Sequence, residues 1–469
     1  MATPNESLQA ARKALPSHRV PGEPLSRSEL AEEVNRYLFE TTSRRYDLDR
    51  HQIARYERGE VRWPGAAYRA GLRAVLGAHS DAALGFMPRK QRTAPTSAPA
   101  ADGLPAGWHP ADVVDAAERM TSQDVAVSRR QALASASALA GSALTEPLQG
   151  WLLPRAGRPA GSSAISEAEL AGWRDVADRF RGWSTSPTGL LARKAVIAQL
   201  NELSDRLNDA ADTSTTRRAF LVGAQLAETA ASMSWDSGLH RDAQRYYTLA
   251  VQFAKVSGDT TFGAVTLAAF ARQSYDLGRP RDGLELVQLA QYGTRQTAGP
   301  RLRSLLATRE AWAYAQHGAV QAFRRAAGLA EDHFGEGRDD TDDQWVDGLD
   351  EAELYGVLGA RWRDLTMTTH KHSEARHAQH YIHRALTLRD PTRTRNRAFD
   401  LIGLARTHLI TAEPDRACEL IDQALPLTSD WAPGRIGTKL ADFHRESQRF
   451  ASSPRVRNTR AAVRDLIEA

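Results

Sequence analysis

The sequence of 469 residues has a single cysteine, Cys418, and no long apolar run. One cysteine cannot form an internal disulfide, which fits a reducing compartment. No stretch of 18 consecutive apolar residues is present, and the N-terminus lacks the apolar core of a signal peptide. These absences argue against a disulfide-stabilised secreted domain and a transmembrane helix. We therefore expect a cytoplasmic protein that does not enter a membrane.

Sequence patterns typical of catalysis are also missing. The chain has no glycine-rich phosphate loop ending in Lys-Ser or Lys-Thr, no nucleophile elbow, no His-Glu-x-x-His and no Cys-x-x-Cys. Cys418 follows Ala417 in a predicted helix, where it is better explained as a small core residue than as a nucleophile. We predict no catalytic residues, no cofactor and no enzymatic activity.

One group of histidines is dense enough to consider as a metal site. It comprises five residues within fourteen positions: His370, His372, His377, His380 and His383. Two of them spaced three apart on a helix could share an ion such as Zn²⁺. No cysteine or adjacent carboxylate pair completes a ligand set, so we predict no metal site. Surface histidines are the simpler interpretation, and a pH-responsive surface is the other alternative.

The net charge of +4 is small but unevenly distributed. Residues 1–92 contain 16 basic and 11 acidic residues, a net charge of +5, whereas the rest of the chain has 45 basic and 46 acidic residues. The basic excess thus lies entirely in the N-terminal part, where it would attract nucleic-acid phosphates. Locally basic chain ends are common, so this distribution is only supporting evidence.

Two consecutive helices are predicted in this basic region, and the second has both ends marked. Asp49 can accept a hydrogen bond from a free backbone N–H, and Gln52 three residues later can reach back to it. Leu48 and Ile53 can form a hydrophobic staple across the cap. Gly59 tolerates the left-handed conformation that ends a helix.

The sides of this helix differ in chemistry. Ile53 and Tyr56 predict an inward face. The opposite face carries side chains of the types that read base edges and hold phosphates, namely Arg50, His51, Gln52 and Arg55. A solvated surface is the alternative interpretation, but the caps on two successive helices favour DNA binding.

The preceding helix shows the same organisation. Ser26 and Glu29 predict a capping box, and Leu25 and Leu30 a staple. One helical face is apolar and comprises Leu30, Ala31, Val34, Tyr37 and Leu38. A third helix, marked by Tyr68, Leu72, Val75 and Leu76, could close a small core. Two capped amphipathic helices joined by a polar segment predict a helix-turn-helix.

These residues resemble a known family. Leu25-Ser26 with Glu29-Leu30-Ala31, followed by Ile-Ala-Arg-Tyr-Glu-Arg-Gly over 53–59, resembles the Cro/C1-type (XRE-like) helix-turn-helix. The stretch 61–69 is similar to a version common in actinobacterial regulators. The segment 35–47 is longer than the family's tight turn, so either the second helix is extended or the turn is a loop. The resemblance implies double-stranded DNA as partner and a homodimer on two half-sites. Candidate phosphate contacts are Arg27, Arg44, Arg45, Arg58 and Arg62.

A repeated pattern fills the C-terminal part. A small residue, a large apolar residue four positions on and an alanine three further recur five times, with starts separated by 40, 36, 59 and 39 residues. The sets are Ala243/Tyr247/Ala250, Gly283/Val287/Ala290, Ala319/Phe323/Ala326, Ala378/Ile382/Ala385 and Ala417/Ile421/Ala424. This pattern resembles the second helix of tetratricopeptide repeats. The resemblance implies a helical solenoid whose concave face holds peptides, helices or small molecules. The 59-residue interval predicts an acidic insertion over 331–353, which we interpret as a solvated excursion.

The predicted fold is all-α, with an N-terminal helix-turn-helix domain linked to a tetratricopeptide-like solenoid. The predicted segments are a flexible arm over 1–24, a helix-turn-helix domain over 25–87, a linker over 88–110, a helical connector over 111–163 and a repeat domain over 164–469. Arg12, Lys13 and Arg19 in the arm could contact phosphates, although a disordered tail is the simpler interpretation.

We expect a cytoplasmic transcriptional regulator, such as a repressor. Its repeat domain would sense a peptide or small-molecule effector, or mediate oligomerisation. The alternative is a tetratricopeptide-type interaction scaffold with a vestigial or adaptor helix-turn-helix. An enzyme is a distant third.

Overall fold

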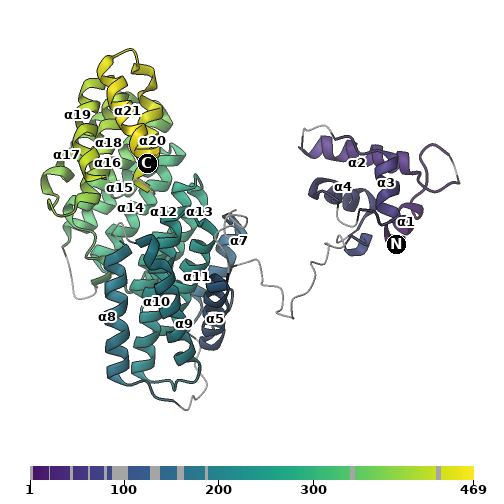
Figure 1. Cartoon of the computed structure of the whole chain (residues 1–469), viewed down its shortest axis with the longest axis horizontal. Coiled ribbons are helices and arrows are strands. Elements are labelled where there is room, and N and C mark those ends of the chain that lie inside the picture. Colours follow the sequence, from purple (N-terminus) through teal and green to yellow (C-terminus); the bar gives the residue numbers. More distant parts are fainter. Residues whose placement is uncertain are drawn as a thin grey trace. The chain divides into compact units, whose positions relative to one another are not determined.

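The computed structural model describes residues 4–20, 22–42, 46–61, 64–78, 82–86, 104–126, 138–155, 163–184, 189–337, 344–428 and 435–468. Within these ranges the fold is all-α, as predicted: no β-strand forms, and two isolated β-bridges join Pro16 to Pro24 and Ser163 to Ala210. The chain divides into two compact units, unit 1 (Met1–Ala100) and unit 2 (Ala101–Ala469) (Figure 1). No helix in the described parts is long and apolar enough to cross a membrane.

Unit 1 is a small helical bundle around one apolar core. Its elements are α1 (Glu6–Lys13), α2 (Arg27–Thr42), α3 (Arg50–Glu57), α4 (Ala66–Leu76) and the short 3₁₀ helix η1 (Ala82–Leu84). Each of these helices contributes side chains to the buried core, together with residues beside the helices. The core comprises Leu8, Leu25, Leu30, Ala31, Val34, Leu38, Leu48, Ile53, Tyr56, Leu72, Leu84 and Phe86. The two staples predicted from sequence therefore lie in this core. Tyr37, predicted on the same face, is instead 37% exposed.

The described residues 4–20 contain a helix and contacts with the unit 1 core, in place of the flexible arm expected for 1–24 from its prolines. Asn5 caps α1 by accepting the Leu8 N–H at 3.1 Å, and Leu8 is fully buried in the unit 1 core. Arg12, considered above as a phosphate contact, is buried and paired with Glu57 at 2.7 Å. The expectation was wrong because the helix is short and polar, and it is held by contacts with distant residues that its own sequence does not reveal.

The start of α2 is fixed by one carboxylate. Glu29 and Ser26 form the predicted capping box, with the Ser26 N–H 2.9 Å from Glu29 Oε2. The other oxygen, Oε1, accepts hydrogen bonds from the Ser17 hydroxyl and from the His18 and Arg19 N–H groups at 2.7–3.1 Å. Hydrogen bonds, that from the Ser26 side chain first, lower the pKa of Glu29 to about 2. Glu29 thus ties the 17–19 turn to α2.

Unit 2 consists mainly of consecutive helix pairs. The described first helices are α10 (Ser214–Asp236), α12 (Thr260–Asp276), α14 (Pro300–His317), α16 (Glu351–Thr369), α18 (Thr394–Ile410) and α20 (Arg435–Glu446). The second helices that follow them are α11 (His240–Ser257), α13 (Pro280–Thr294), α15 (Val320–Gly335), α17 (Ala375–Leu388), α19 (Pro414–Ala424) and α21 (Pro454–Glu468). Helices α8 (Glu167–Ser184) and α9 (Gly189–Asn208) precede them. The pairs follow one another in chain order along the unit, from teal to yellow in Figure 1.

The five small–large–Ala sets lie in, or at the first residue before, the second helices α11, α13, α15, α17 and α19. Their large apolar members and their terminal alanines are all buried. The small first member lets the paired helix approach closely: a Cβ on Gly283 would lie 2.2 Å from a ring carbon of Tyr275 on α12. The repeated pattern is thus a packing requirement between neighbouring helices.

The interval between the third and fourth sets is an insertion between α15 and α16, as its length predicted. Residues 338–343, including Asp339, Asp340, Asp342 and Asp343, lie outside the described residues. The end of the insertion is not a solvated excursion. Trp345 in η4 (Gln344–Val346) stacks edge-on against Phe262 with ring centroids 4.9 Å apart, and its indole N–H donates to Asp259 at 3.0 Å.

The described parts of the predicted connector, 111–126 and 138–155, pack on the helices of unit 2. The region contains α5 (Pro110–Ala126), α7 (Ser142–Thr145) and η3 (Glu146–Leu152). α5 packs on α9, and the Leu139 N–H donates to Gln244 of α11 at 2.7 Å. Trp151 is 2% exposed, and a Cβ on Gly263 of α12 would lie 2.4 Å from its ring. Part of the predicted linker packs here too, since Leu104 is buried; residues 88–103 lie outside the described residues.

Replacing Trp151 tests whether this region belongs to the unit 2 core. Trp151→Ala is expected to destabilise unit 2 by about 3–5 kcal/mol, because a fully buried indole is lost and a cavity remains. Leu153→Ala, two residues away at a side chain 60% exposed, is the matched control and should change little. Chemical unfolding of the full chain measures both; equal midpoints for the two variants would show that 111–163 is an independent connector.

The hydrogen bonds on Glu29 predict an acid dependence. Since its folded pKa is lowered to about 2, its contribution to stability is complete above the unfolded pKa of about 4.3 and is lost as the pH falls toward 2. The difference in the unit 1 unfolding midpoint between wild type and Glu29→Gln should therefore shrink between pH 5 and 2.5. Hydrogen exchange under urea, followed by mass spectrometry, measures it in the full chain. Glu32→Gln, an exposed glutamate on the same helix, should show no such trend.

Candidate nucleic-acid interface and a basic cavity

The ends of α3 lie where the sequence predicted them. The Asp49 carboxylate accepts the N–H groups of His51 and Gln52 at 2.9 and 2.7 Å. At the other end Gly59 has a φ of +72°, and its N–H donates to the Tyr56 carbonyl at 3.1 Å. The left-handed glycine stops the helix and turns the chain away.

The inward face of α3 is also as predicted. Ile53 is fully buried and Tyr56 is 6% exposed. The Tyr56 ring meets Phe86 edge-on, with centroids 6.1 Å apart. Burial raises the pKa of the Tyr56 hydroxyl. These two side chains seat the helix on the core of unit 1 and leave its other side toward solvent.

A side chain of α2 holds the chain just before α3. The Asn35 carboxamide donates to the Leu48 carbonyl at 2.8 Å and accepts the Leu48 N–H at 3.0 Å. This bidentate contact satisfies both backbone groups of Leu48, the residue before the helix cap. The position of α3 relative to α2 is therefore set by Asn35, and not by a tight turn.

A buried carboxylate fixes the other end of α3. Glu57 accepts Arg12 Nε from α1 and Arg27 Nε from α2, each at 2.7 Å. Its backbone carbonyl accepts the Asn5 N–H at 2.7 Å. Glu57 thus joins α1, α2 and α3. The sequence does not reveal this role, because Glu57 stands between Tyr56 and Arg58 like an ordinary charged surface residue.

The solvent face of α3 carries most of the predicted base-reading residues. Arg50, His51 and Arg55 are exposed, and Arg50 Nε donates to His51 Nε2 at 3.3 Å. Arg55 and the predicted phosphate contact Arg58 are 55% and 57% exposed. Both guanidinium groups reach one acceptor, Glu60, at 3.3 and 2.7 Å.

Two predicted DNA contacts, Gln52 and Arg27, are not fully available on the solvent face. The Gln52 Oε1 atom is buried and accepts no hydrogen bond from the described residues, so the predicted return bond to Asp49 is absent and this atom does not face solvent. Arg27 is 43% exposed but bound to Glu57. Arg44, Arg45 and Arg62 lie outside the described residues.

The other candidates from the sequence are part of the unit 2 scaffold or surface. Cys418 is buried and free. Among the described residues no group of three or more His, Cys, Asp or Glu side chains is arranged to hold a metal ion. In the histidine cluster, His377 stacks on Trp362 with centroids 4.6 Å apart, and His372 Nδ1 lies 3.1 Å from the Ile410 carbonyl.

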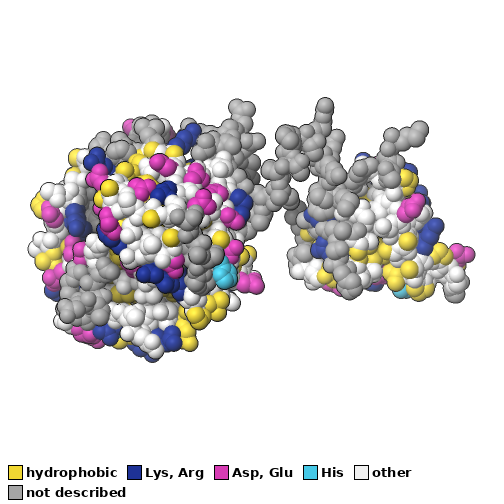
Figure 2. All heavy atoms as spheres, turned by 90° about the horizontal axis from the view of Figure 1, so that it is seen from below, with side chains coloured by type: hydrophobic (Ala, Val, Ile, Leu, Met, Phe, Trp, Pro, Cys, Tyr) yellow, Lys and Arg dark blue, Asp and Glu magenta, His cyan; other side chains and the backbone are white. Residues whose placement is uncertain are grey.

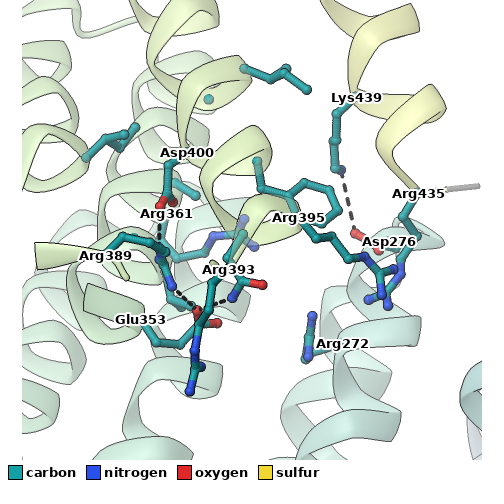
Figure 3. Close-up of a pocket in the computed structure, with 18 of the residues that line it drawn as sticks. Arg272, Asp276, Glu353, Arg361, Arg389, Arg393, Arg395, Asp400, Arg435 and Lys439 are labelled. Carbon is teal, nitrogen blue, oxygen red and sulfur yellow. Dashed lines mark hydrogen bonds and ion pairs between the residues drawn. The ribbon is translucent and has the colours of Figure 1, made fainter. Parts of the chain in front are cut away.

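Unit 2 contains a cavity of about 690 Å³ that the sequence did not predict. Its walls come from the first helices α10, α12, α14, α16, α18 and α20, with Arg181 of α8, Ile382 of α17 and the segment before α18. The cationic side chains in this lining are Arg181, Arg272, Arg309, Arg361, Arg363, Arg389, Arg393, Arg395, Arg435 and Lys439. The acidic ones are Glu228, Asp276, Glu353 and Asp400 (Figure 3).

The charges on the outer surface are arranged differently. On the face of unit 2 that Figure 2 shows, basic and acidic side chains alternate in small groups with scattered apolar ones. An excess of one sign is therefore a property of the cavity and not of this face. Mixed surface charge is ordinary for a protein, whereas a concentration of arginines in a concave site is not.

No protein-family model matches the sequence, and no curated protein matches it significantly. The interpretation of both sites therefore depends on their own residues and geometry.

The arrangement around α3 offers a matched pair of carboxylates, each bound to two arginines. Glu57→Ala leaves Arg12 buried without a partner and is expected to destabilise unit 1 by about 3–5 kcal/mol. Glu60→Ala, at a site 42% exposed, should change the stability of unit 1 little, because exposed ion pairs are screened by solvent. Hydrogen exchange of unit 1 peptides in the full chain under increasing urea measures both. Equal, small effects would contradict the role assigned to Glu57.

Proposed function

We propose that the chain is a sequence-specific DNA-binding transcriptional regulator. In this proposal α2 and α3 form a Cro/C1-type helix-turn-helix, and α3 enters the major groove. The observation that carries it is the division of α3: Ile53, Tyr56 and Glu57 are held by α1, α2 and the core, while Arg50, His51 and Arg55 are exposed together on the other side. A rigid helix with an arginine-rich outer face suits base-edge readout.

The number of copies that we propose to bind DNA together follows from the length of α3. α3 has eight residues, and its first two exposed side chains lie in the turn capped by Asp49. So short a helix contacts only a few base pairs, and useful selectivity needs a second copy on a neighbouring half-site. We therefore propose a homodimer on two-fold-related DNA. Arg58 and Arg27 are the described candidates for phosphate contacts.

We further propose that unit 2 is a tetratricopeptide-like solenoid that senses an effector or assembles the oligomer. Two observations support this. The small–large–Ala sets recur on second helices, where they allow close pairing. The first helices line a common cavity, as the inner helices of a solenoid do. A peptide or a small molecule is the effector class that such a concave face can hold.

The alternative function is an interaction scaffold in which unit 1 no longer reads DNA. One observation favours it: Arg55 and Arg58 both reach Glu60, so part of the positive charge at the end of α3 is already balanced. DNA phosphates would have to compete with that carboxylate. The distinction is experimental.

The test is selection of bound genomic fragments by the full chain at near-physiological salt, followed by fluorescence anisotropy on the recovered sequence. Arg50→Ala and Arg55→Ala should each cost about 1–3 kcal/mol on that sequence and relax preference at single positions. Arg58→Ala should weaken binding to all sequences alike and reduce the salt slope by about 1.

A control removes equal charge elsewhere in unit 1. Arg19→Ala/Arg36→Ala takes two exposed arginines that pair with Glu32 and Glu33, and it should keep the selected motif. Recovery of a two-fold-related motif that is lost only in the α3 variants supports the regulator. Weak, motif-free binding that the α3 variants and the Arg19→Ala/Arg36→Ala control share equally would overturn it in favour of the scaffold.

A further inference from the structure

The cavity in unit 2 holds more positive charge than its neighbours balance. Ten cationic and four acidic side chains line it. Three further carboxylates, which are not part of the lining, form ion pairs with lining cations. The pairs are Asp236 with Arg395 and Arg435, Asp364 with Arg361 and Arg363, and Asp350 with Arg393. With Arg181 left out, the nine other lining cations still exceed these seven carboxylates of the described residues by two.

The lining arginines fall into two kinds. Arg389 is fully engaged, with Nε 2.8 Å from Asp400, Nη1 2.9 Å from Glu353 and Nη2 3.1 Å from the Ala352 carbonyl (Figure 3). It is a structural residue that joins α16 to α18. Lys439 is paired with Asp276 at 3.7 Å. These contacts define the wall and do not need a ligand.

Three arginines on successive first helices are less completely neutralised. Neither Arg272 of α12 nor Arg309 of α14 forms an ion pair with a described carboxylate, and no dashed line reaches Arg272 in Figure 3. Arg361 of α16 lies 3.4 Å over the Trp312 ring and 3.3 Å from Asp364, but its Nε and Nη1 are buried and donate to no acceptor among the described residues. Arg309 Nε is likewise buried and unpartnered.

These three guanidinium groups are close enough to affect one another. Burial, followed by the charge of Arg272, lowers the pKa of Arg309 to about 9, and Arg361 adds to the effect. Burial also lowers the pKa of Arg361 to about 10. The pKa values of Arg309 and Arg361 stay above neutral pH, so the cavity keeps like charges together at a cost in stability. A bound anion would remove that cost.

We propose that this cavity binds a small anion carrying two or more phosphate groups, held by Arg272, Arg309 and Arg361. Three features fit this class. Nine of the ten lining cations are arginines, whose planar forks bind phosphate oxygens bidentately. The volume of 690 Å³ is that of a small-molecule site. Apolar side chains such as Val357 and Phe399 are a minority of the lining, which disfavours an apolar signal.

The proposal specifies the effector of the proposed regulator, but anion binding does not depend on DNA binding. Calorimetry without DNA therefore tests the cavity alone, and an effect of the ligand on DNA affinity would test the link to the proposed function. The probe is inorganic pyrophosphate, titrated into the full chain at constant ionic strength. Parallel titrations with ADP and with fructose 1,6-bisphosphate separate a nucleotide source from a sugar-phosphate source.

Two substitutions test the arginines. Arg272→Met and Arg309→Met should each weaken pyrophosphate binding about tenfold or more, since a charge-assisted hydrogen bond is lost. Arg309→Met should also raise the thermal midpoint of the free protein, because it removes an unpaired buried charge. Arg303→Met, on the same α14 helix but exposed and paired with Glu336, is the matched control and should bind as wild type does.

The titrations have outcomes that support the proposal and outcomes that overturn it. Saturable pyrophosphate binding that is lost in the Arg272 and Arg309 variants and kept in the Arg303 variant supports the proposal. Citrate binding as tight as pyrophosphate would overturn the phosphate assignment. So would the absence of any saturable binding, or equal affinities in all three variants.

Discussion

Unpaired positive charge inside unit 2 is the constraint on which its interior depends. The first helices must carry arginines toward one another, which works only because the second helices fix their spacing through small residues such as Gly283 and through buried alanines. Arg389 then links α16 to α18 through Glu353 and Asp400. A concave wall that is rigid on its outer side can hold repelling charges on its inner side at a modest cost in stability. Scaffold and site thus have separate residues.

Unit 1 also contains buried charged groups, but there they are paired. There the buried charge is balanced: Glu57 neutralises Arg12 and Arg27, and Asn35 satisfies the backbone of Leu48. The contacts of Glu57 and Asn35 orient α3, whereas Arg50, His51 and Arg55 on its outer face are exposed and lie outside the core. The outer face is therefore free to vary in chemistry while the inner face is not, a division that is expected of a recognition element.

The sequence predicted the elements whose determinants are local. Caps at Asp49 and Ser26 and the stop at Gly59 depend on side chains within a few residues, and the repeated sets depend on a fixed helical spacing. It did not predict what depends on distant partners. α1 was missed because Arg12 is buried only through Glu57, 45 residues away. The cavity was not predicted because the sequence does not distinguish a buried arginine without an ion pair, such as Arg309, from an arginine on the surface.

The two hydrogen bonds between Asn35 and Leu48 fix the start of α3 directly to α2. Because α3 is positioned by hydrogen bonds from α2 and by Glu57, its placement does not require a tight turn after α2. Doubling the length of such a loop costs only about 0.6 kcal/mol in closure entropy. A longer or shorter loop is therefore compatible with the same position of α3 on the core of unit 1.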